Sequence, residues 1–169
     1  MELVSIITPC YNSAKYIGQM IESIQAQTYK NWELLITDDC STDNSKDVIM
    51  SYAEKDSRVK YFKLPQNSGA GIARNNSIEK AAGRYIAFCD SDDMWKAEKL
   101  EKQLQFMQDN NYEFCHCYTL VVDENNNIVG LNKKPKRVSF QSTRIINYIV
   151  QMEVIMIVQV KMKDMLMKR

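Results

Sequence analysis

The segment Tyr85-Ile86-Ala87-Phe88-Cys89-Asp90-Ser91-Asp92-Asp93 joins an apolar run directly to three carboxylates. An uninterrupted apolar run is typical of a strand that is covered on both faces. Carboxylates delivered into one turn repel each other unless something offsets the repulsion. A hard divalent cation would do so, because Mg²⁺ and Mn²⁺ typically take one or two carboxylates together with phosphate oxygens and water. The alternative is a solvated acidic turn that caps the following helix.

The chain on either side of this segment alternates apolar runs with segments of helical periodicity. The expected strands are Leu3–Thr8, Trp32–Thr37, Val59–Leu64 and Tyr85–Cys89. Pro9 is expected to end the first of them. The expected helices cover residues 15–27, the region of Val48 and Tyr52, 69–82 and 96–110. This alternation predicts an α/β fold with a mostly parallel, doubly wound sheet flanked by helices.

Polar clusters follow three of the expected strands, at Pro9–Tyr11, Asp38–Asp39 and Asp90–Asp93. In doubly wound sheets, ligands bind beyond the carboxyl ends of the strands. We therefore expect these three clusters to meet at one binding site.

The C-terminal part of the chain has a different character. Phe114 to Val122 is expected to be a strand, followed by a hairpin turn at Asn125–Asn127. Residues 133–137 are a basic, linker-like stretch. Further on, the apolar residues at even positions from 152 to 162 would form one face of a strand, and a helix is the competing interpretation. The expected organisation is a core over 1–130, then a basic linker and an atypical tail over 131–169.

The overall composition limits the class of protein. The chain has 169 residues, of which 45% are hydrophobic and 25% charged, which fits one globular domain. A net charge of +1 argues against a nucleic-acid partner. Five cysteines without a regular spacing, no signal peptide and no apolar stretch of ~20 residues predict a cytoplasmic protein, with peripheral association at the inner face of the membrane left open.

Five groups of residues, in order along the chain, resemble the motifs of the family 2 glycosyltransferases. They are Val4–Asn12, Ile21–Thr28, Glu33–Asp43, Asn67-Ser68-Gly69 with Ala73-Arg74-Asn75, and Phe88–Asp93. The resemblance, from about Val4 to Val122, implies the GT-A fold and an enzyme that transfers a sugar with inversion. The donor would be a nucleotide sugar, often a UDP-sugar, and the acceptor a glycan or lipid-linked molecule in cell-surface polysaccharide synthesis.

The resemblance also implies roles for individual residues. Pro9 and Tyr11 would frame the nucleotide base, and Asp39 would accept a hydrogen bond from the uracil imide. Arg74 would lie near the base or the diphosphate. Asp90 would lie by the ribose or sugar, and Asp92, with Asp90 as the second candidate, would bind the Mn²⁺ or Mg²⁺ that bridges the phosphates.

These assignments have structural alternatives. Tyr11 could close a loop against the core, Asp38 and Asp39 could be cap and turn residues, and Arg74 could extend over the surface of its helix.

Two other motifs fit poorly. Gly69-Ala70-Gly71 has Arg74 where a dinucleotide fingerprint has its third glycine, and it follows the third strand instead of the first. Cys115-His116-Cys117 is too tight for a zinc site without a second ligand pair, and strand alternation predicts buried thiols with a surface histidine.

An inverting transferase needs a general base, which the resemblance places further along, in the acceptor-binding half. After Asp123-Glu124 the acidic residues are Glu153 and Asp164, and neither lies in a motif of that kind. The general base is therefore expected beyond the end of this chain. Because the likeness stops near Val150, we hypothesise that the frame ends early or shifts there, which translation of the source DNA in all frames would test. The alternative function is a nucleotide-sugar-binding fragment without turnover.

Overall fold

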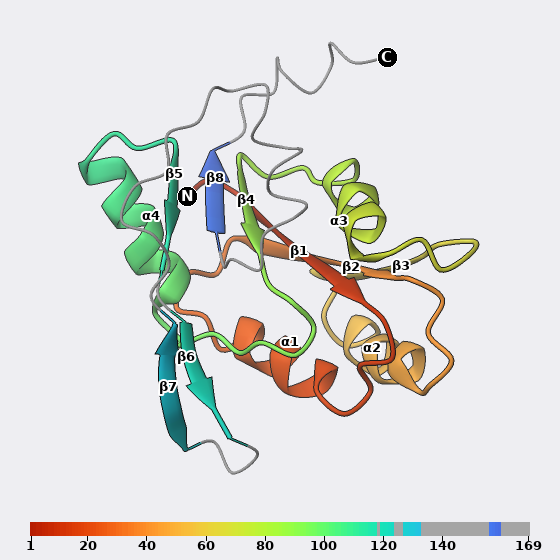
Figure 1. Cartoon of the computed structure of the whole chain (residues 1–169). Helices are drawn as coiled ribbons and strands as arrows, with labels where there is room; N and C mark the ends of the chain where they lie inside the picture. Colours follow the sequence, from red (N-terminus) through yellow and green to blue (C-terminus); the bar gives the residue numbers. More distant parts are fainter. Residues whose placement is uncertain (118, 124–126, 133–155, 160–169) are drawn as a thin grey trace.

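The computed structural model describes residues 1–117, 119–123, 127–132 and 156–159 (Figure 1). Its main element is a six-stranded sheet with the strand order β3-β2-β1-β4-β8-β5. These strands are β1 (Val4–Cys10), β2 (Trp32–Asp38), β3 (Val59–Lys63), β4 (Tyr85–Phe88), β5 (Phe114–His116) and β8 (Met156–Gln159). The strands β1 to β4 pair in parallel, whereas β8 runs antiparallel to both of its neighbours. The predicted mostly parallel sheet is confirmed.

Among the described residues, four helices connect and cover the strands. They are α1 (Ile17–Gln25), α2 (Ser45–Ala53), α3 (Ala70–Ile78) and α4 (Lys99–Asp109). Helices α1 and α2 contact each other on one side of the sheet, and α3 packs on β1 and β2 from the other side (Figure 1). The helices were all expected from the sequence, and α1, α3 and α4 are shorter than predicted.

The core has two parts, one on each face of the sheet. Successive side chains of a strand point to opposite faces, so Ile6 of β1 joins the larger cluster with apolar residues of α1, α2 and α4. Its neighbour Ile7 joins the smaller cluster, against which Ile78 of α3 packs. Burial on both faces explains why the strands are continuous apolar runs in the sequence.

The sequence suggested that Pro9 ends the first strand. This prediction is wrong, because β1 continues to Cys10. The carbonyl of Ile7 accepts a hydrogen bond from the Cys89 N–H on the β4 side, and residues two apart face the same side of a strand. The pairing of β1 with β4 ends at Ile7. The nitrogen of Pro9 therefore points to the β4 side beyond the last paired residue. No hydrogen bond between strands is lost there, although proline has no N–H to donate.

The expected strand Phe114–Val122 is divided between two sheets. Residues of β5 join the main sheet, while β6 (Thr119–Val122) pairs antiparallel with β7 (Ile128–Asn132). The Asp123 N–H donates to the Asn127 carbonyl, which confirms a hairpin here. Asn125, Asn126 and the basic stretch 133–137 lie outside the described residues. In the tail, β8 confirms the strand interpretation for residues 156–159.

The end of the sheet opposite the polar clusters is fixed by buried polar contacts around Gly83. The Gly83 N–H donates to Ser5 Oγ at 2.8 Å, and Ser5 Oγ donates to Glu33 at 2.6 Å. A Cβ on residue 83 would lie 2.6 Å from the backbone nitrogen of Ser5 and 2.8 Å from the carbonyl oxygen of Leu3. Backbone atoms of a central strand cannot move aside as a flexible side chain would.

We expect Gly83→Ala to lower the free energy of unfolding by about 1–3 kcal/mol, the cost of forcing a methyl group into a packed site. Urea denaturation checks this. Gly130→Ala is the matched control, because its Cβ would meet Val121 at an ordinary 3.7 Å. Equal stability of the Gly83→Ala chain and the unchanged protein would contradict the prediction.

Candidate functional site

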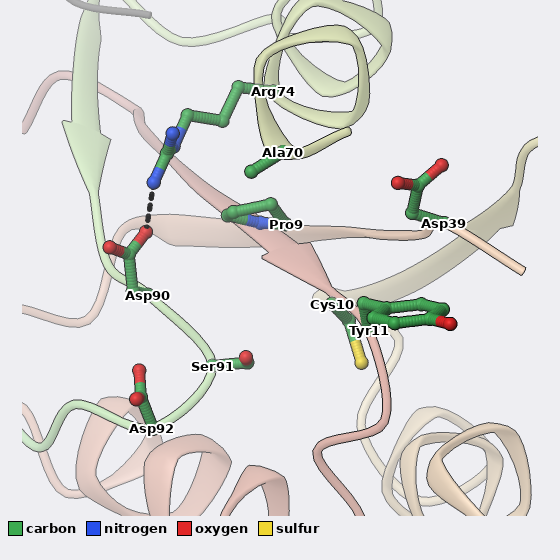
Figure 2. Close-up of a pocket in the computed structure, with 9 residues that line it drawn as sticks. All are labelled: Pro9, Cys10, Tyr11, Asp39, Ala70, Arg74, Asp90, Ser91 and Asp92. Carbon is green, nitrogen blue, oxygen red and sulfur yellow. Dashed lines mark hydrogen bonds and ion pairs between the residues drawn. The ribbon is translucent and has the colours of Figure 1, made fainter. Parts of the chain in front are cut away.

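A cavity lies where the order of the strands reverses. From β1 the sheet extends one way to β2 and β3, and the chain then returns to the opposite side of β1 as β4. Open α/β sheets bind ligands at such a switch point, beyond the carboxyl ends of the strands. The cavity here has a volume of about 220 Å³ and is lined by Pro9, Cys10, Tyr11, Asp39, Ala70, Arg74, Asp90, Ser91 and Asp92 (Figure 2). All six residues predicted from the sequence border it.

Tyr11 follows the last residue of β1 and is 50% exposed, so its ring does not close the loop against the core. The next residue, Asn12, has a left-handed φ of 50°, a conformation that asparagine adopts more readily than most residues. Its Oδ1 accepts a hydrogen bond from the Thr42 N–H at 2.8 Å. This turn places the Tyr11 side chain at the cavity that Pro9 also lines.

The two aspartates after β2 have different surroundings. Asp38 is buried, and its oxygens accept hydrogen bonds from the Ser41 N–H and the Tyr61 hydroxyl. It therefore stabilises the turn after β2, which was the structural alternative predicted for it. Burial and the bond to Asp38 raise the pKa of Tyr61. Asp39 faces the cavity instead.

The Asp39 carboxylate already holds the loop that leads into α3. Its Oδ1 accepts from the Ser68 N–H and its Oδ2 from the Gly69 N–H, both at 2.7 Å. Each carboxylate oxygen can accept more than one hydrogen bond, so capacity remains for a ligand. These bonds reach residues 29 and 30 positions further along the chain, so Asp39 connects two loops, and its contact with a base stays a prediction.

Arg74 lies on α3 and is only 9% exposed, which rules out a residue extended over the helix surface. Its Nη2 is 2.6 Å from Oδ1 of Asp90 (Figure 2). This ion pair joins α3 to the turn after β4 across the cavity. It also leaves Oδ2 of Asp90 without a basic partner among the described residues.

The acidic turn does not cap the next helix. α4 begins at Lys99 with Glu98 as its N-cap residue, six residues beyond Asp92. The Asp92 side chain is exposed at the cavity, and Figure 2 shows it on the same side as Asp90, away from Asp39. Within the described part of the chain, no group of three or more acidic, cysteine or histidine residues could hold a metal ion.

This donor set nevertheless fits a cation that is shared with a ligand. Mg²⁺ is usually held by one or two carboxylates while phosphate oxygens and water fill the other positions. Asp92, with Asp90 as the second candidate, offers that number of carboxylates at the cavity. The residues present therefore fit a cation that binds together with a diphosphate.

His116 is not the surface residue that alternation predicted. It is half-buried, and its Nδ1 is buried without a hydrogen-bond partner among the described residues. It shares a strand face with Phe114, which packs against the smaller core cluster. Cys115 is buried, as expected, whereas Cys117 is only half-buried.

The mostly parallel sheet, with a cavity at its switch point, is the fold of a class of protein, the GT-A glycosyltransferases. A model of the Glycosyl transferase family 2 matches residues 5–160. The chain belongs to this family. The match continues beyond Val150, where the motifs in the sequence ended.

Named relatives are glycosyltransferases. The putative teichuronic acid biosynthesis glycosyltransferase TuaG of Bacillus subtilis is 49% identical over 112 residues, which are 66% of this chain and 44% of the relative. The UDP-Glc:alpha-D-GlcNAc-diphosphoundecaprenol beta-1,3-glucosyltransferase WfgD of Escherichia coli is 43% identical over 138 residues, 82% of this chain and 53% of the relative. The chain thus spans about half the length of these curated relatives.

Solved structures agree with the fold. Residues 1–349 of TarS from S. aureus in complex with UDP superpose with a TM-score of 0.63 at 33% identity, covering 68% of this chain and 34% of that one. The mannosyltransferase PcManGT from Pyrobaculum calidifontis, solved with GDP-Man and Mn²⁺, has a TM-score of 0.63 at 23% identity over 73% of this chain and 36% of that one, which shows the shared fold. No helix in the described part of this chain is long and apolar enough to cross a membrane.

Three residues that line the cavity were not singled out from the sequence: Cys10, Ala70 and Ser91. Burial raises the pKa of the Cys10 thiol, so it is a neutral wall of the cavity. The methyl side chain of Ala70 does not indicate a binding role in the sequence. Ser91 was noticed only as the residue between Asp90 and Asp92. Their position follows from the packing of α3 and β4 beside β1.

Proposed function

We propose that this chain binds a nucleotide-sugar donor, with a UDP-sugar as the preferred one, for transfer of the sugar with inversion. The observation that carries the proposal is the meeting of Tyr11, Asp39, Arg74 and the acidic turn around one cavity at the switch point. A volume of about 220 Å³ is less than the ~300–1,000 Å³ of pockets that enclose a whole ligand. The described walls would therefore contact one part of the donor.

The base would lie on the side of the cavity where Asp39 and Tyr11 are. Pro9 and Tyr11 would frame it, since an exposed ring can stack on a base. A remaining lone pair of Asp39 would accept the uracil imide proton. TarS, which is 33% identical, was solved with UDP, and this supports uridine as the nucleoside.

The diphosphate would lie on the other side, between Arg74 and the acidic turn. Asp92, with Asp90 as the second candidate, would hold Mn²⁺ or Mg²⁺. A bound cation would neutralise charge on the departing diphosphate. Arg74 adds a positive charge that its pairing with Asp90 holds in place, and Asp90 would lie near the ribose or sugar.

The acceptor is inferred from the named relatives. WfgD acts on a diphosphoundecaprenol-linked sugar, and TuaG is named for teichuronic acid synthesis. We propose a glycan or lipid-linked acceptor in cell-surface polysaccharide synthesis, with peripheral association at the inner face of the membrane, where such an acceptor is reached from the cytoplasm.

Calorimetric titration with UDP, CDP, ADP and GDP, with Mn²⁺ and with EDTA, tests the donor proposal. We expect UDP to bind most tightly and its affinity to rise at least about tenfold with Mn²⁺. Absence of UDP binding under both conditions would contradict it. Release of UDP from a UDP-sugar in the presence of acceptor would demonstrate transfer, and UDP binding without such release would support the binding-only alternative.

A further inference from the structure

Two serine hydroxyls join the two sides of the cavity. Ser13 lies in the loop after β1, Ser91 lies in the acidic turn after β4, and their Oγ atoms are 2.7 Å apart. Ser13 is only 7% exposed. Figure 2 shows the Ser91 side chain directed from the acidic turn toward Cys10, the last residue of β1, and Tyr11, which follows it. The contact connects residues that are 78 positions apart in the sequence.

Ser13 Oγ has a second neighbour. It lies 3.2 Å from the carbonyl oxygen of Tyr11, which can only accept. A hydroxyl has one proton to donate. When Ser13 gives its proton to Tyr11, Ser91 is the donor to Ser13, and either hydroxyl can donate in the bond between them. One side chain thus holds both the backbone of Tyr11 and the acidic turn.

Ser13 is itself fixed from the start of α2. Its backbone N–H donates to Oγ of Ser45 at 2.8 Å, and Ser45 is fully buried. The Ser45 hydroxyl donates to Oδ1 of Asp43, and Oδ2 of Asp43 accepts from the Ala14 N–H at 3.0 Å. Several hydrogen bonds therefore fix the loop that carries Ser13. The bond between the Ser13 and Ser91 hydroxyls connects this fixed loop to the acidic turn.

We propose that Ser13 is a positioning residue that acts through Ser91 on the cation-binding turn. It sets the distance between Tyr11, on the base side, and Asp92, on the diphosphate side. This inference rests on the proposed function, because it requires one nucleotide to contact both sides. Losing the bond would leave the base side intact while loosening the turn that holds the cation.

The test compares uridine, which has no phosphate, with UDP. In Ser91→Ala, which leaves the bond between Ser13 and the Tyr11 carbonyl in place, we expect UDP affinity in Mn²⁺ to fall about three- to tenfold, the range of one hydrogen bond. Uridine affinity should stay within about twofold. Ser13→Ala should lose at least as much UDP affinity, because it removes the same bond and also the bond to the Tyr11 carbonyl. The double variant should be no weaker than Ser13→Ala alone.

Ser51→Ala is the matched control, because Ser51 is exposed on α2 and its hydroxyl bonds within its own helix. Unchanged UDP affinity in both single variants, or equal losses for uridine and UDP in Ser91→Ala, would overturn the inference while leaving the proposed function in place. Failure of the unaltered chain to bind UDP would overturn the proposed function and this inference with it.

Discussion

Asp92→Ala is expected to remove the Mn²⁺-dependent part of UDP binding, with a loss of about 100-fold in affinity when Mn²⁺ is present. Asp92 is the exposed carboxylate of the acidic turn at the cavity. The other candidate ligand, Asp90, gives one oxygen to Arg74. Because the protein offers so few carboxylates, loss of one removes most of its hold on the cation, and the cation's contribution to diphosphate binding goes with it.

Titration of UDP in Mn²⁺ and in EDTA measures this effect. In EDTA the unaltered chain and Asp92→Ala should bind UDP equally, since the base-side contacts remain. Asp47→Asn removes one negative charge from the exposed first turn of α2 and should behave like the unaltered chain. The metal assignment fails if Asp92→Ala keeps the full Mn²⁺ dependence.

The same site predicts weak cation binding without nucleotide. The described residues contain no cluster of three or more ligating side chains, so phosphate oxygens must complete the coordination. Mn²⁺ alone should therefore bind this chain much more weakly than it does with UDP present. Titration with Mn²⁺ by itself distinguishes this shared site from a preformed one.

The fold was predictable because its signals are local. Apolar runs of strand length alternate with amphipathic helices, and this pattern is sufficient to predict a parallel sheet. The division between β5 and β6 was not predictable, because Phe114 to Val122 contains no strong breaker. The continuation of β1 through Pro9 depends on where β4 stops pairing, which is a tertiary feature.

The sequence was sufficient to predict most of the residues that line the candidate site, but not which of them bond to each other. Motifs identified Tyr11, Asp39, Arg74 and the acidic turn, and strand ends predicted that they meet. Nothing local indicates that Arg74 pairs with Asp90, or that Ser13 bonds to Ser91, because these partners come together only when the sheet forms. Such contacts need the packing of α3 and of β4 beside β1.

Asp39 has a structural role in addition to the base contact that we propose for it. An asparagine at this position keeps one acceptor oxygen but presents an NH₂ group to the second backbone N–H. One of the two N–H groups, of Ser68 or Gly69, then loses its partner. Both residues are solvent-exposed, so water can replace the bond, and Asp39→Asn should lower the free energy of unfolding by about 1–3 kcal/mol.

The effect of Asp39→Asn on nucleotide choice should be larger. The uracil imide donates a proton that a carboxylate accepts, whereas cytosine has an acceptor at the same ring position. We expect UDP affinity to fall about 10- to 100-fold, the range for a hydrogen bond to a charged group. CDP affinity should fall much less, so the preference for UDP over CDP decreases at least about tenfold. Calorimetry with both nucleotides at one Mn²⁺ concentration measures the ratio.

Asp38→Asn is the control that separates the two roles of Asp39. Asp38 is the neighbouring aspartate, and both of its oxygens also accept hydrogen bonds, but it does not border the cavity. It should therefore lose stability without changing the ratio of UDP to CDP affinity. If Asp39→Asn likewise leaves that ratio unchanged, Asp39 serves only to hold the loop before α3, and base selection must come from the framing by Pro9 and Tyr11.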